Sequence, residues 1–177
     1  MNNVSKLKPK PSTLDIIGQI ADAIRPTFKA PANKMSDADP TPAELKTTAE
    51  LIGRADMRNI LALHNYARTL VNSGEILHQS AEQAATWALL YVTQGRLNFL
   101  PALTWNDLRC RLQYFAEAEA DDVWPDGCKI EGLEQAQRDV RLLSHNNIEL
   151  AKEEADRWYT DGEPRRHGWH DAAEAAE

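Results

Sequence analysis

The residues in this sequence best suited to chemistry are five carboxylates that fall within residues 117–126. They are Glu117, Glu119, Asp121, Asp122 and Asp126, and no lysine or arginine stands between Leu112 and Cys128. Carboxylates three or four residues apart on a helix repel one another, and a basic partner or a cation relieves that repulsion. We therefore predict an acidic contact surface for a basic protein partner, which could also imitate nucleic-acid phosphates. The alternative is a solvated helix end.

A calcium-binding loop fits this acidic segment poorly. Counting from Asp122 puts Trp124 at the third ligand position and Leu133 where the bidentate glutamate belongs. Trp124 suits a protein contact better, because partly exposed tryptophans often anchor interfaces. We expect Trp124 to bind the partner together with the surrounding acids.

Catalytic motifs are absent from the sequence. It has no glycine-rich phosphate loop, no HExxH and no GxSxG, and its two cysteines do not form a CxxC pair. His64 lies on an apolar stripe, which favours a core or interface histidine over a general base. We expect no cofactor and no enzymatic activity. A metal-dependent enzyme remains an alternative, because the tail has helical spacing among His167, His170 and Glu174, with Asp171 beside them, although Gly168 favours a frayed terminus.

The N-terminus has the opposite charge. Residues 1–11 contain Lys6, Lys8 and Lys10 with two prolines and few apolar side chains, which predicts a flexible basic arm. In the alternative hypothesis of nucleic-acid binding, this arm would contact the phosphates. After it, an amphipathic helix ends near Pro26, and we expect its apolar face to dock onto a partner; that face carries Leu14, Ile17, Ile20 and Ile24.

The elements that position these residues are all predicted to be helices. Helix starts are marked by Thr41-Pro42-Ala43-Glu44, by Asp56, by Ser80 with Gln83, and by Thr104 with Asp107, while Gly53 and Gly95 mark expected ends. A long C-terminal helix is predicted from about Glu131 to Trp158, with room for a break near residues 144–147. The apolar positions expected to face the core are Trp105, Leu108, Leu112 and Phe115, followed by Leu133, Ala136, Val140 and Leu143.

No segment alternates with the period of a strand. We therefore predict an all-α, single compact bundle of five to six helices. Residues 1–35 hold the arm, a short helix and a linker, residues 36–160 the helical domain, and residues 161–177 an acidic tail.

Composition narrows the function classes. The net charge of −7 and the pI near 5.3 disfavour binding of a nucleic-acid backbone by the protein as a whole. We expect no leader and no membrane span, and therefore a cytoplasmic protein. The function predicted is that of a phage-like helical interaction module, which would serve as an adaptor, inhibitor or assembly component. The other hypothesis is a small DNA-binding packaging or regulatory protein that uses the arm and a helix-turn-helix.

Overall fold

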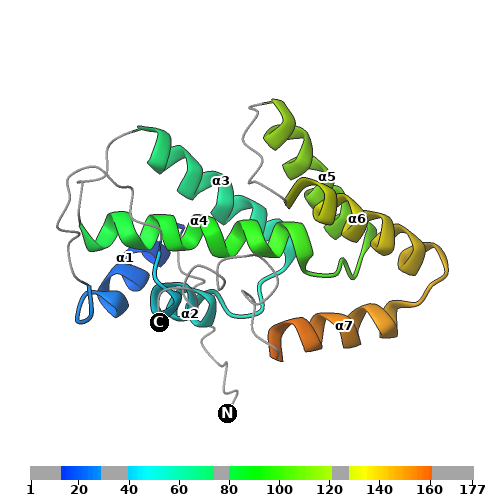
Figure 1. Cartoon of the computed structure of the whole chain (residues 1–177), viewed down its shortest axis with the longest axis horizontal. Helices are drawn as coiled ribbons and strands as arrows, with labels where there is room; N and C mark the ends of the chain where they lie inside the picture. Colours follow the sequence, from blue (N-terminus) through cyan, green and yellow to red (C-terminus); the bar gives the residue numbers. More distant parts are fainter. Residues whose placement is uncertain (1–12, 29–39, 74–79, 121–127, 161–177) are drawn as a thin grey trace, which may run out of the picture.

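The computed structural model describes residues 13–28, 40–73, 80–120 and 128–160, and the chain is all-α within these ranges. The predicted fold class is confirmed, although the described residues form seven helices rather than five or six (Figure 1). They are α1 (Thr13–Ile24), α2 (Pro42–Ile52), α3 (Met57–Ser73), α4 (Ala81–Phe99), α5 (Trp105–Ala120), α6 (Cys128–Ser144) and α7 (Ile148–Thr160).

Side-chain caps begin α2, α3 and α4 where the sequence predicted them. The Thr41 hydroxyl accepts a hydrogen bond from the Glu44 backbone N–H at 3.3 Å, while the Glu44 carboxylate accepts one from the Thr41 N–H at 2.8 Å. The Ser80 hydroxyl accepts from the Gln83 backbone N–H at 3.1 Å at the start of α4, and the Asp56 carboxylate accepts from the Asn59 N–H in the first turn of α3. These bonds satisfy N–H groups that a helix start would otherwise leave unpaired.

One predicted helix end differs from the structure, and one break that the sequence allowed is formed. α4 continues through Gly95 to Phe99, because Gly95 is buried and the packing of α4 against the surrounding helices outweighs the poor helix propensity of glycine. The predicted C-terminal helix is divided into α6 and α7 at Asn146, whose φ of 54° is in the left-handed region. Asparagine tolerates that conformation better than most residues, so the break falls at the site that the sequence allowed.

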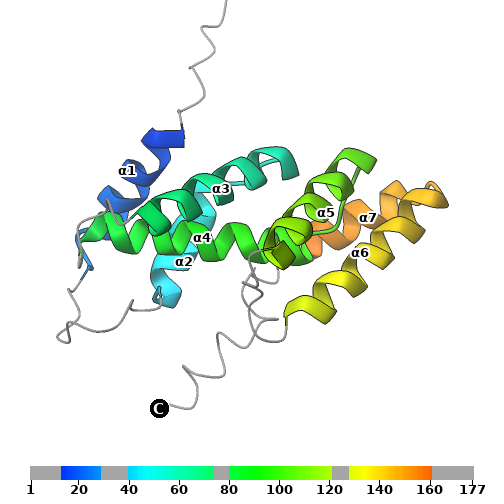
Figure 2. The same cartoon turned by 90° about the horizontal axis from the view of Figure 1, so that it is seen from above.

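α4 is the central element of the fold. It packs against α1, α2 and α3 and also against α5 and α6, and α3 contributes to the core clusters at both ends of α4. Figure 2 shows α1 beside the first part of α4, α3 running along α4, and α5 to α7 at the other end of α4. Neighbours on all sides bury small and apolar positions around the whole of α4, from Ala85 to Phe99.

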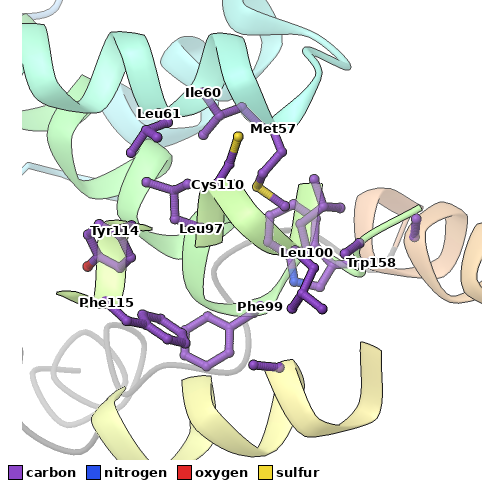
Figure 3. Packing of buried hydrophobic residues seen from close by; sticks show 14 of the residues in the cluster. Met57, Ile60, Leu61, Leu97, Phe99, Leu100, Cys110, Tyr114, Phe115 and Trp158 are labelled. Carbon is purple, nitrogen blue, oxygen red and sulfur yellow. The ribbon is translucent and has the colours of Figure 1, made fainter. Parts of the chain in front are cut away.

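The larger core cluster lies where the end of α4 meets α3, α5, α6 and α7 (Figure 3). Phe99 and Phe115 point toward one another beside α6, and Trp158 enters this cluster from α7. A second cluster joins α1 to α3 and α4 and includes Ile20 and Leu89, both fully buried. The two clusters share α3 and α4, and these two helices therefore connect the halves of the protein.

Two buried arginines cap helix C-termini at the junctions of the fold. Arg96, 1% exposed, donates to the Gly53 carbonyl at 2.6 Å and to the Ala49 carbonyl at 3.1 Å, at the end of α2. Arg111, fully buried, donates to the Leu97 and Leu100 carbonyls at the end of α4. A cation at this position satisfies orphan carbonyls and complements the helix dipole.

The charge of Arg111 is balanced inside the core by Asp139 of α6, which is also fully buried. The second oxygen of Asp139 accepts from the Ala102 backbone N–H at 3.2 Å and from the Gln135 amide at 2.9 Å. Burial lowers the pKa of Arg111 to about 9, which still leaves the guanidinium charged at neutral pH. This network joins the end of α4 to α5 and α6.

Candidate partner-binding surface

The structure places the predicted docking face of the first helix inside the protein. Ile17, Ile20 and Ile24 are 8%, 0% and 2% exposed, and α1 packs against α2 and α4 of its own chain. The side chain of Leu14 lies outside the described residues. An amphipathic pattern reports that a face is buried but does not name the element that covers it, and here the cover is the chain itself.

Only two of the predicted acidic contact residues are described. Glu117 and Glu119 belong to the last turns of α5, and Glu119 pairs with Lys129 of α6 at 2.5 Å. The Gln113 amide donates to Glu117 at 2.9 Å. Asp121, Asp122, Trp124 and Asp126 lie outside the described residues. Lys129 comes just after the acidic segment in the sequence, and folding brings it back onto the end of α5.

The alternative binding hypotheses depend on residues that the structure does not describe. Lys6, Lys8 and Lys10 precede the first described residue, and His167, His170, Asp171 and Glu174 follow the last one. Among the described residues, no group of three or more histidine, cysteine, aspartate or glutamate side chains is placed to hold a metal ion. Within the same ranges, no helix is long and apolar enough to cross a membrane.

The outer face of α5 is exposed where the sequence predicted a core position. Trp105 is 57% exposed and Leu112 is 49% exposed, whereas Leu108 and Phe115 are buried as expected. Four side chains spaced by three or four residues (Trp105, Arg109, Leu112 and Ala116) continue to Glu119 and form one exposed strip, which we call the α5 strip. Large apolar groups thus lead along the helix toward the acidic segment.

α6 also has an apolar face that points away from the core. Leu133 and Val140 are 41% and 43% exposed, although the sequence pattern placed them in the core with Ala136 and Leu143, which are buried. Ile130 is 69% exposed and lies on the same side of α6. The mixed pattern arises because α6 is apolar on two sides, and α4 and α5 cover only one of them.

A cleft of about 850 Å³ separates α6 from α7. Its walls carry charges of both signs. The Arg138 guanidinium of α6 reaches across the cleft to the Glu154 carboxylate of α7 and donates to it from Nε, at 2.9 Å, and from a terminal nitrogen. The remaining lining is Phe99, Pro101, Glu131, Glu134, Gln135, Gln137, Arg141, Arg157 and Trp158. Equal numbers of arginine and glutamate give this cleft no preference for an anion or a cation.

The side chains with catalytic potential in the core are not accessible. Burial lowers the pKa of His64 to about 4, and its Nδ1 lies 3.2 Å from the Thr93 hydroxyl while its ring meets Tyr114 edge to face. Burial also raises the pKa of the Cys110 thiol. A neutral buried imidazole and a protonated buried thiol act here as packing groups between α3, α4 and α5.

Comparison with known proteins gives this chain no relative: no family model, no curated protein and no solved structure matches it.

Proposed function

We propose that this protein is a non-enzymatic interaction module, an adaptor, inhibitor or assembly component, which binds a protein partner through the α5 strip and the acidic segment that follows it. The observation that carries this proposal is the exposure of Trp105, 57%, on the same strip as Leu112. Exposed tryptophan and leucine on one helix face favour a contact, because covering them removes a large apolar area from water.

The chemistry of the strip indicates the chemistry of the partner. Its first part carries Trp105 and Leu112 with Arg109 between them, and its end at Glu119 continues into residues 120–128, which contain further acids and no base. A partner with an apolar patch beside basic residues would match both parts. The apolar contact would supply affinity, while the acids would accelerate encounter and make it depend on salt.

Affinity capture from the cells that express the protein tests this proposal. The wild type is compared with Leu112→Glu and with Leu51→Glu, a control on α2 where the replaced leucine is 40% exposed. A protein retained by the wild type and by Leu51→Glu, but lost with Leu112→Glu, supports the proposal. Equal retention by all three baits, or the absence of any retained protein, contradicts it.

Charge reversal at Asp121 and Asp122 then examines the acidic part with the partner identified by capture. We expect weaker binding and a flatter dependence of affinity on salt, because fewer complementary charges meet in the complex. Unchanged affinity would remove the acidic segment from the proposed surface while leaving the α5 strip in place.

A further inference from the structure

α6 presents three different sides. One side packs into the core through Ala136, Asp139 and Leu143. A second side lines the cleft that faces α7. The third side carries Leu133 and Val140, and no other described helix covers it, because both side chains remain about two-fifths exposed.

Around Gln137, where the second and third sides of α6 meet, five exposed residues form a compact patch, and three of them, Glu134, Gln137 and Arg141, also line the edge of the cleft. Leu133 and Glu134 lie four and three residues before Gln137, while Val140 and Arg141 lie three and four residues after it. These are the spacings at which side chains neighbour one another on a helix surface and pack against a crossing helix. We call these five residues the α6 patch.

The α6 patch is complementary to itself. A two-fold axis beside Gln137 would place Leu133 against Val140 of a second copy and Glu134 against its Arg141, and each of these contacts would occur twice. The two Gln137 amides would meet at the axis, where each can donate and accept a hydrogen bond. Glu134 and Arg141 make no ion pair with any other described residue, so both charges are free for this contact.

We propose that the α6 patch binds the same patch of a second copy of this chain in an antiparallel, two-fold symmetric dimer. A protein with only basic or only acidic residues would match one end of the patch, whereas a second copy matches both ends. Two-fold dimers with self-complementary surfaces are the commonest oligomers. A crossing of one helix from each copy buries little area, so the dimer is weak and depends on concentration.

This proposal goes beyond the proposed function and does not depend on it, because the α5 strip and the α6 patch are separate surfaces. Loss of the dimer would leave partner capture by the α5 strip untouched. Loss of capture would likewise leave the dimer in place.

Sedimentation velocity of the full chain over a range of protein concentrations tests the dimer. We expect the wild type to change from monomer to dimer as its concentration rises. Leu133→Glu should weaken the dimer by about tenfold or more, because it replaces a buried apolar contact by a charge. Leu51→Glu is the matched control, since Leu51 and Leu133 are 40% and 41% exposed.

A charge exchange tests the antiparallel geometry. Glu134→Arg should weaken the dimer because it places two like charges together, and Glu134→Arg combined with Arg141→Glu should restore it because the pairs form again with their signs exchanged. Circular dichroism of each variant checks that the fold is retained. A wild type that stays monomeric at every concentration overturns the proposal, as does an equal effect of Leu133→Glu and Leu51→Glu. Failure of the double variant to restore the dimer also overturns it.

Discussion

Asp139→Ala should strongly destabilise the fold, because it leaves the Arg111 guanidinium buried without its counter-ion. Both side chains are fully buried in the native protein. Breaking such a pair from one side costs about 3–5 kcal/mol, compared with a total stability of about 5–15 kcal/mol for a typical protein. In a chain of this size, the expected fall in melting temperature is about 6–20 °C.

The control for this prediction is the exposed pair between Arg54 and Asp156, whose nitrogen and oxygen lie 2.5 Å apart with both side chains more than 60% exposed. Asp156→Ala should cost at most about 1 kcal/mol, because water solvates the arginine that remains. Urea unfolding followed by circular dichroism measures the free energy of unfolding of both variants. The comparison separates burial from ion pairing as the source of the effect.

A double-mutant cycle with Arg111→Met completes the test of the buried pair. Each single variant leaves one buried charge without its partner, whereas the double variant removes both charges. The sum of the two single costs should therefore exceed the cost of the double variant by at least about 2 kcal/mol. Additive costs, or a cost of Asp139→Ala below about 1 kcal/mol, would refute the reasoning and show that water reaches the charges.

Two further predictions concern the packing of the core. The pKa of His64 is 6.5 in the unfolded chain and about 4 in the folded protein, so as the pH falls the unfolded state binds the proton first. The free energy of unfolding should therefore fall by about 3 kcal/mol as the pH drops from above 6.5 to 4. Urea titrations at each pH should lack this fall in His64→Gln, and an unchanged pH profile of that variant would contradict the prediction. Gly132→Ala should lower the melting temperature, although alanine has the better helix propensity. The new Cβ would lie 3.0 Å from Asn98 Oδ1 and from Phe115 Cζ, and such overpacking costs about 1–3 kcal/mol. A variant with a higher melting temperature would contradict this and show that the neighbouring side chains move to make room.

The starts of the helices were predictable because their signals are local. The capping box at Thr41 and Glu44 and the cap at Ser80 each involve residues only three positions apart, and the structure forms both. The end of α4 was not predictable from Gly95. Glycine weakens an isolated helix, but packing against neighbouring helices can outweigh this cost, and only the tertiary structure shows which effect prevails.

The candidate surfaces were predictable only in part. The three-and-four spacing of apolar residues placed Leu112 and Leu133 in the core, because a sequence pattern identifies apolar positions without showing which of them another helix covers. The same limitation applied to α1, whose apolar face was assigned to a partner and is covered by α4. At Leu112 and Leu133 a predicted core position is exposed, and in α1 a predicted contact face is buried.

By itself, the sequence determined the all-α class, the starts of α2, α3 and α4, and the possibility of a break near Asn146. These features depend on interactions between residues that are close in the chain. Only the tertiary structure decided that Arg96 and Arg111 cap helix ends inside the protein and that Trp105 lies on the surface. Burial is decided by helices distant in sequence, whose carbonyls and carboxylates offset the loss of hydration of a charge only when the fold brings them together.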